Sequence, residues 1–163
     1  METDARTNTP TNRWYGAIMI LLFLVIAFAL APRDESNRNA NASLAASCLR
    51  TLHSANEAYA EDHPQQGYPK ELSDLSDSSS SPENGKHADW MISPILAGGK
   101  TGGYKFTYSS QSTKGDGKLD AYQIFADPLV PGKTGTHYFF VDETGMIRMS
   151  DTGPANATSP ILE

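Results

Sequence analysis

The chain opens with a short polar stretch, continues with one uncharged apolar run, and is predominantly polar from there onward. Residues 14–31, WYGAIMILLFLVIAFALA, contain no charged side chain. A bilayer core of about 30 Å needs roughly 17 to 25 apolar residues in a helix, so this run is long enough to cross a membrane once. Trp14 and Tyr15 stand at its first edge, where amphipathic rings prefer the headgroup level. The pattern predicts a polar tail over residues 1–13 and a transmembrane helix over residues 14–31.

The same run also fits a secretory signal. Ala29-Leu30-Ala31 and Ala27-Phe28-Ala29 both offer the small-x-small pattern at which such signals are cleaved. After the first of these, however, the next residue is Pro32, whose ring fits poorly where a peptidase binds an extended chain. We therefore expect a retained single-pass anchor, with cleavage and release of the downstream domain as the alternative. The short tail before the run and the large acidic part after it favour a C-terminal domain that is periplasmic or extracellular.

Residues 32–62 have the spacing of a long amphipathic helix. Apolar positions recur at steps of three or four residues and should form one stripe, namely Leu44, Cys48, Leu52, Ala55 and Tyr59. Frequent alanine raises helix propensity, and Pro64 and Gly67 end the pattern.

Residues 63–102 are predicted to form a variable loop with little regular structure. Leu72 and Leu75 can pin a single helical turn to a core, and residues 87–97 can form a short helix. The apolar side chains that would hold this helix are Trp90, Ile92, Ile95 and Leu96.

Residues 103–150 change to the period of two that is typical of strands. Alternating aromatic and aliphatic positions predict strands over residues 103–110, 120–127, 137–143 and 146–150. Short turns join them in sequence, so the fold class predicted is α+β, with the long helix packed on a four-stranded antiparallel sheet. Residues 151–163 are predicted to be a flexible tail.

About half of the aromatic side chains in this sheet should enter its core, since successive strand residues face opposite sides. Tyr104, Phe106 and Tyr108 should share the buried face. Phe139 and Phe140 are adjacent and must face opposite sides, so one of them is a candidate contact residue on an exposed patch.

Charge and chemistry narrow the function further. The formal net charge is −6 and no basic cluster occurs, which excludes nucleic acid as an expected partner. The single cysteine, Cys48, is expected to be a small buried residue. The four histidines, His53, His63, His87 and His137, have no metal-ligand spacing, and no nucleophile, acid–base pair or phosphate loop is visible. We therefore expect no enzyme activity, no cofactor, and no catalytic, cofactor-binding or metal residues.

Two carboxylates qualify this last expectation. Asp116 and Asp120 flank the glycines of KGDGK, where a weak oxygen-ligand site for calcium is conceivable. Turn chemistry is the simpler reading, because Asp and Gly suit a hairpin backbone.

The ordered series of segments resembles the type IV pilins and type II secretion pseudopilins. AASCLRTLHSANEAYAEDHPQQGYPKELSDL (45–75) is similar to the end of their long helix and the Gly-Tyr-Pro loop that follows it. GYKFTY and AYQIFADPLVPGKTGTHYFFVDETGMIR (within 103–148) are similar to their sheet, with an aromatic first strand, an Ala-Asp-Pro strand end and a final hairpin around Asp-x-x-Gly.

The resemblance implies a bacterial, non-enzymatic membrane protein with a structural or accessory role in a pilus or secretion-type surface assembly. Its partners would be the lipid bilayer, through the N-terminal helix, and copies of itself or other pilin-like subunits. The chain departs from the family at the span. Gly16 is followed by Ala17 rather than phenylalanine, and Leu21 stands where the family has a glutamate that sets filament register. The expectation is a membrane-anchored pilin-like protein that need not polymerise.

Overall fold

The computed structural model describes residues 19–20, 34–76 and 92–162. The chain divides into two units, residues 1–33 and 34–163. In the first unit, only Met19 and Ile20 are described, and both are helical and exposed. The predicted transmembrane helix otherwise lies outside the described residues. Within the described ranges, no helix combines the length and the apolar character needed to cross a membrane.

The second unit is built on one long helix, α2 (Asp34–Asp62), which carries Asp34 and Glu35 in its first turn. Acidic side chains at that end complement the helix dipole. Its buried positions are spaced by three and four residues along one stripe, namely Ala42, Ala45, Leu49, Leu52, Asn56 and Tyr59.

The buried stripe of α2 matches the predicted one in its second half, where Leu52, Ala55 and Tyr59 are buried, and departs from it in the first half. Leu44, predicted to be buried, is 45% exposed and packs against the backbone of Gly102, while Leu49 is fully buried. Leu44 and Leu49 are five residues apart, which is about 140° around a helix, so they cannot both face the sheet. Alanines occur on both possible faces of the first half of α2, so their pattern does not distinguish the two stripes. Packing against the sheet determines that the stripe with Leu49 is buried.

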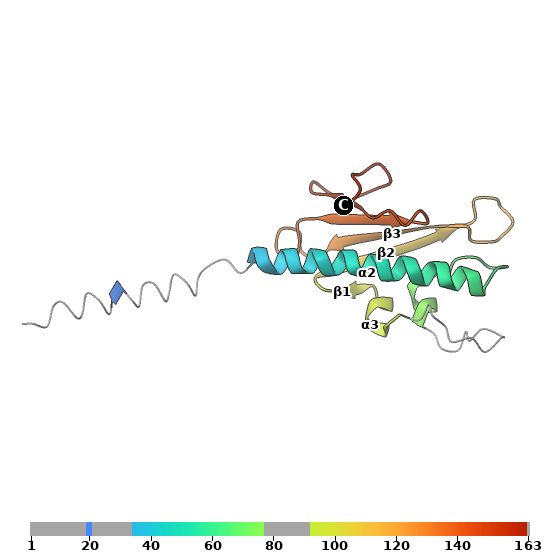
Figure 1. Cartoon of the computed structure of the whole chain (residues 1–163), viewed down its shortest axis with the longest axis horizontal. Helices are drawn as coiled ribbons and strands as arrows, with labels where there is room; N and C mark the ends of the chain where they lie inside the picture. Colours follow the sequence, from blue (N-terminus) through green and yellow to red (C-terminus); the bar gives the residue numbers. More distant parts are fainter. Residues whose placement is uncertain (1–18, 21–33, 77–91, 163) are drawn as a thin grey trace, which may run out of the picture. The chain divides into compact units, whose positions relative to one another are not determined.

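The sheet has five strands rather than the four predicted, in the order β1-β2-β3-β4-β5 with every pair antiparallel (Figure 1). Their bounds are β1 (Lys100–Thr101), β2 (Tyr104–Gln111), β3 (Ala121–Pro128), β4 (Tyr138–Asp142) and β5 (Arg148–Ser150). β1 is too short for any alternation to be visible in the sequence. It pairs with β2 across a turn in which Gly102 and Gly103 have φ of 55° and 76°, a region open mainly to glycine.

One face of this meander packs on α2 and forms the core. Tyr104 and Phe106 of β2, Ile124 of β3 and Val141 of β4 are each at most 4% exposed, and they belong to one apolar cluster with Leu49 of α2. The predicted alternation in the first two strands is therefore confirmed. The structure is α+β, with a long helix on an antiparallel sheet.

The connection from α2 to β1 is more ordered at its ends than predicted. Leu72 and Leu75 are buried in a 3-10 helix, η1 (Leu72–Ser76), which confirms the predicted pin. Residues 77–91, with Trp90, lie outside the described residues. The described part of the predicted helix over 87–97 is α3 (Pro94–Ala97), capped by the Ser93 side chain. It begins at Pro94 because proline suits a first helical turn, and Ile95, predicted as an anchor, is 69% exposed.

The end of the chain follows the sheet edge beyond β5 instead of forming the flexible tail expected for 151–163. Ile161 forms an antiparallel bridge with Arg148. The Met149 amide donates to the Pro160 carbonyl at 2.9 Å, and the Leu162 amide donates to the Ile147 carbonyl at 2.8 Å. Figure 1 shows this segment on the side of the sheet opposite β1. The composition of TGPANATSPILE is typical of a loose tail, whereas the structure orders it through its pairing with β5 and through the hydrogen bond from Arg148 Nη1 to the Ser159 carbonyl.

Candidate functional site

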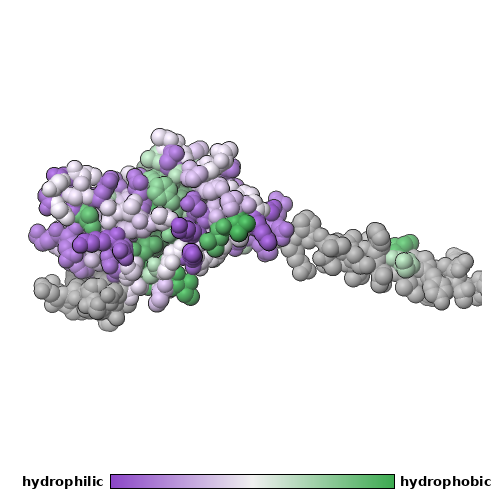
Figure 2. All heavy atoms as spheres, turned by 180° about the vertical axis from the view of Figure 1, so that it is seen from behind, coloured by the Kyte–Doolittle hydropathy of each residue, from purple (hydrophilic) through white to green (hydrophobic). Residues whose placement is uncertain are grey.

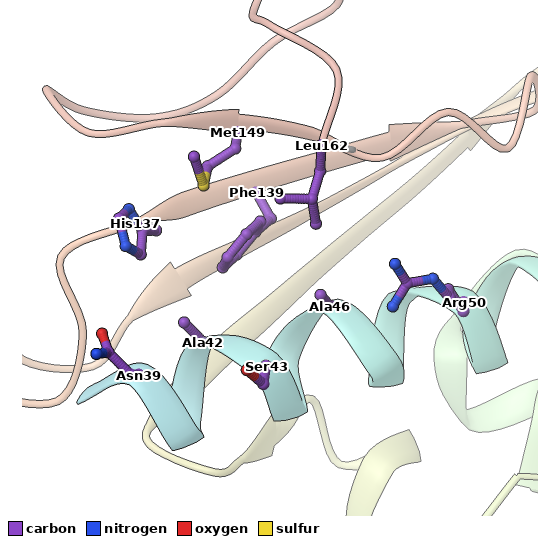
Figure 3. Close-up of a pocket in the computed structure, with 9 residues that line it drawn as sticks. All are labelled: Asn39, Ala42, Ser43, Ala46, Arg50, His137, Phe139, Met149 and Leu162. Atoms are coloured by element: carbon purple, nitrogen blue, oxygen red, sulfur yellow. The ribbon is translucent and has the colours of Figure 1, made fainter. Parts of the chain in front are cut away.

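A groove of about 390 Å³ runs between the first half of α2 and the β4–β5 edge of the sheet (Figure 3). Small side chains of α2 form one wall, and larger side chains of the sheet face them. The lining residues are Asn39, Ala42, Ser43, Ala46 and Arg50 of α2, His137 and Phe139 at β4, Met149 of β5 and Leu162.

The groove has an apolar floor and polar ends. Ala42, Ala46 and Phe139 are at most 8% exposed and lie at its base. Arg50 and Asn39 are exposed and stand toward opposite ends of the α2 wall in Figure 3. His137 Nδ1 lies 2.5 Å from Asp151 Oδ1, which holds the imidazole in position beside the groove. The groove can accept an aliphatic or aromatic group and offers one permanent positive charge.

Sequence reasoning did not identify this groove. It expected no binding residue on α2 and treated the segment that contains Leu162 as a tail. Nothing in the sequence pairs residue 43 with residue 162, because the groove exists only where the end of the chain returns to the sheet edge.

A second cluster of polar and aromatic side chains fixes the far half of α2. Asn56 is fully buried; its Nδ2 donates to the Leu52 carbonyl at 2.7 Å, and its Oδ1 lies 2.9 Å from the Tyr108 hydroxyl. The same hydroxyl lies 2.9 Å from the Pro69 carbonyl. The hydroxyl proton of Tyr108 is thus shared between two acceptors, the Asn56 side chain on the helix and the Pro69 carbonyl in the loop. Burial is the chief cause that raises the pKa of Tyr108.

The Gly-Tyr-Pro segment is the loop half of this cluster. Gly67 has φ of 79° and pairs with Leu119, whose carbonyl oxygen would conflict with any Cβ at position 67. The Tyr68 ring meets Tyr122 edge-on, with centroids 4.7 Å apart, and its hydroxyl donates to Glu57 Oε1 at 3.0 Å. The segment therefore ties the end of α2 to the loop between β2 and β3.

Asp116 and Asp120, the conceivable calcium ligands, both accept hydrogen bonds within the β2–β3 turn. Asp120 accepts from the backbone and the hydroxyl of Thr113, each at 2.6 Å, and Asp116 accepts from the Lys118 amide at 3.0 Å. The Thr113 hydrogen bonds, helped by nearby Lys114, lower the pKa of Asp120. These contacts are those of a capped turn, as the simpler reading predicted.

The described histidines have separate surroundings. His53 Nδ1 lies 2.6 Å from the Tyr122 hydroxyl, and the His63 ring stacks on Tyr59 with centroids 4.1 Å apart. His87 lies outside the described residues. Among the side chains that the structure describes, no group of three or more His, Cys, Asp or Glu is placed to hold a metal ion. Cys48 is half-buried, and burial raises the pKa of its thiol.

The prediction of one exposed phenylalanine on β4 is wrong. Phe139 is 2% exposed on the α2 face, and Phe140, on the other face, is 1% exposed and lies beside the Phe125 ring with centroids 5.2 Å apart. Alternation placed the two side chains on opposite faces correctly. It could not show that the second face is covered here, where Ala155 in the C-terminal segment is also 1% exposed.

Comparison with known proteins adds no identification: no family model, no curated protein and no solved structure matches this chain.

Proposed function

We propose that this chain is a non-enzymatic, membrane-anchored pilin-like protein with a structural or accessory role in a pilus or secretion-type surface assembly. The observation that carries the proposal is the order of parts along the chain. An uncharged run ends at Ala31, α2 begins at Asp34, and buried side chains of β2, β3 and β4 pack on one face of that helix. A head built on the continuation of a hydrophobic stem is the arrangement that the resemblance implies.

Contacts at the far end of α2 support the same proposal. The Gly-Tyr-Pro segment that carries part of the resemblance joins the helix end to the loop before β3, because Gly67 forms a bridge with Leu119 and the Tyr68 amide donates to the Leu119 carbonyl. These contacts oppose local opening at the end of α2. That property suits a subunit or scaffold of a surface assembly.

The outward face of α2 bears on the kind of partner. Ala42, Ala45, Ala46 and Ala55 are buried inside the head, so they do not form an exposed face of small residues. The exposed positions include small polar residues, such as Ser43, Ser47, Thr51 and Ser54. Contacts with copies of this chain or with other pilin-like subunits would therefore use a polar surface outside the bilayer, while Leu21 offers no charge to select a register within it.

A secreted or periplasmic binding domain, released by signal cleavage, is the second candidate. The groove beside Arg50 and His137 favours it, since an apolar floor with a cation at the mouth is a common form of small-ligand site. The two candidates differ in whether residues 1–31 remain attached.

The experiment that separates them is alkaline extraction of membranes from cells that express the full chain, followed by mass analysis of its amino terminus. The proposal expects the protein in the membrane pellet with residues 14–31 retained. A soluble protein that starts at Leu30 or Pro32 would establish the second candidate instead.

A charge placed in the apolar run sharpens this test. Leu24→Arg should release the protein or prevent its insertion, because arginine at the centre of a spanning helix costs about 2.5 to 3.5 kcal/mol. Leu24→Ala is the matched control and should stay in the pellet. If both variants remain in the pellet, the apolar run is not the anchor.

Assembly is tested separately by cross-linking in intact membranes. Deletion of residues 1–31 should abolish cross-linked complexes that contain the chain, while deletion of residues 1–13 alone should preserve them. Complexes that survive the longer deletion would contradict a role that depends on the anchor.

A further inference from the structure

Exposed aliphatic side chains gather at the end of the head where α2 begins. Leu129 and Val130, in the loop between β3 and β4, are 47% and 48% exposed, and Leu44 of α2 is 45% exposed. The three surround the Gly102–Gly103 turn: Leu44 packs on Gly102, and the Leu129 amide donates to the Gly103 carbonyl at 2.9 Å. Figure 2 shows an apolar patch near this end of the unit of residues 34–163. We refer to Leu44, Leu129 and Val130 as the apolar rim.

The loop that carries the rim is internally hydrogen-bonded. The Thr134 amide donates to the Val130 carbonyl at 2.9 Å, and the Val130 amide donates to Thr134 Oγ1 at 3.0 Å. The Gly132 amide donates to the Gly135 carbonyl at 2.8 Å. These bonds close a turn over residues 130–134, and Leu129 and Val130 lie at its start rather than on an unrestrained segment.

Side chains from the first turns of α2 fasten this loop to the start of the helix. Arg38 Nη1 donates to the Gly132 carbonyl at 3.1 Å, and Asn41 Nδ2 donates to the Thr134 carbonyl at 2.8 Å. Arg38 comes seven residues after Ala31, the last residue of the apolar run. Seven residues span about 10 Å as a helix and at most about 24 Å when extended. Chain connectivity alone thus limits the separation between Arg38 and the end of that run to at most about 24 Å.

We propose that the apolar rim is a second membrane contact, in which Leu129 and Val130 insert into the headgroup boundary of the bilayer beside the anchor. This inference rests on the proposed membrane anchoring. The anchor keeps the rim at a high effective concentration near the lipid, so a small apolar contact suffices. Lys133, exposed in the same turn, can extend to the lipid phosphates while the Leu129 and Val130 side chains lie deeper.

The size and charge of the rim favour lipid over a protein partner. Three half-exposed aliphatic side chains offer far less than the roughly 800 Å² that each partner buries in a standard protein interface. Local charges balance, since Lys133 and Arg38 are offset by Asp34 and Glu35 in the first turn of α2. Apolar insertion should therefore drive the contact, with little dependence on anionic lipid.

The test uses the full chain, reconstituted in phosphatidylcholine vesicles, with one environment-sensitive fluorophore on a cysteine. Cys48→Ala removes the native thiol, and Val130→Cys places the probe on the rim. Gln111→Cys is the matched control, because this exposed position ends β2 about 23 Å from Tyr104, which begins the strand next to the rim. Circular dichroism verifies that each labelled protein is folded.

The proposal expects the probe at position 130 to shift to the blue and to be quenched by brominated lipid, while the probe at position 111 reports water. Equal emission from both positions, in protein that resists alkaline extraction, would overturn the inference and leave the anchoring intact. Release of the protein by alkali would instead contradict the proposed function.

Two further controls define the mechanism of the shift. Replacing half of the lipid with phosphatidylglycerol should leave the shift at position 130 unchanged, and a shift seen only with the anionic lipid would overturn apolar insertion. Lowering the ratio of protein to lipid should also leave the emission shift at position 130 unchanged. A shift that disappears on dilution would identify a second copy of this chain as the occupant and would overturn the proposal.

Discussion

The buried hydrogen bond between Tyr108 and Asn56 offers the sharpest test of how the head holds together. Tyr108→Phe removes only the hydroxyl and keeps the ring, which stacks on Tyr122 with centroids 6.0 Å apart. The hydroxyl lies 2.9 Å from both Asn56 Oδ1 and the Pro69 carbonyl. The substitution therefore leaves the fully buried Asn56 oxygen without its donor.

The expected cost follows from that loss. A buried polar atom left without a partner costs about 1 to 3 kcal/mol, whereas an ordinary hydrogen bond contributes about 1 kcal/mol net. We expect Tyr108→Phe to lower the free energy of unfolding by about 2 kcal/mol. Asn56→Ala should lower the free energy of unfolding by a similar amount, because the hydrogen bond from the Asn56 side-chain amide to the Leu52 carbonyl is also lost. In the double variant, the Asn56 oxygen that Tyr108→Phe would leave without a donor is already absent. The losses in free energy of unfolding of the two single variants should therefore add up to about 1 kcal/mol more than the loss of the double variant.

The assay is urea unfolding of a fragment that starts at Asp34, followed by circular dichroism, with equal slopes required for all variants. Tyr138→Phe is the control: Tyr138 is half-buried, and within the described residues its hydroxyl has no hydrogen-bond partner, so its loss should change stability by less than about 0.5 kcal/mol. If Asn56→Ala and Tyr108→Phe prove additive within about 0.4 kcal/mol, the two side chains are not coupled and the reasoning is wrong.

Three other predictions use the same fragment. Gly67→Ala should cost more than about 3 kcal/mol, because φ of 79° is combined with a clash against a backbone carbonyl, whereas Gly132→Ala, with φ of 77° and open space around it, should cost only about 1 to 2 kcal/mol; equal losses in urea unfolding would contradict this. Burial raises the pKa of Tyr104 to about 12, so between pH of about 10 and 12 the unfolded chain loses this proton before the native state does, and stability should fall as the pH rises. Spectrophotometric titration should show delayed phenolate formation in the folded protein, and a single step near pH 10 for every tyrosine would refute it. Hydrogen bonds from Thr113 lower the pKa of Asp120, so its stabilisation is present above the unfolded pKa near 4 and is lost as the pH falls through the lower folded value; the urea midpoints of the native chain and Asp120→Asn should converge in acid, and a constant difference would exclude this role.

Elements with a strong period were predictable from the sequence. Tyr104, Phe106 and Ile124 follow the alternation of strands, and the structure buries all three. The turn around Asp116 and Asp120 was predictable from its glycines, and Leu72 and Leu75 from their spacing. In each case the determining interactions are local, so a short window of residues contains the information.

Features that depend on distant partners were not predictable in this way. The choice between Leu44 and Leu49 for the buried face of α2 depends on the sheet, and the covering of Phe140 depends on where the chain goes after β5. The groove beside Arg50 has the same origin, because its walls come from residues about a hundred positions apart. Periodicity gives the face of an element, and only the tertiary fold determines what lies against it.

The two borders of the five-stranded sheet differ in how far they are covered. β1 is two residues long and pairs with β2 only at Tyr104 and Lys105, whereas the bridge between Arg148 and Ile161 occupies part of the outer side of β5. Unpaired strand borders invite other chains to add on, which leads to aggregates. Removal of residues 151–163 should therefore produce a protein that self-associates through β5, and a purification tag attached after Glu163 needs a flexible spacer so that Ile161 and Leu162 keep their positions.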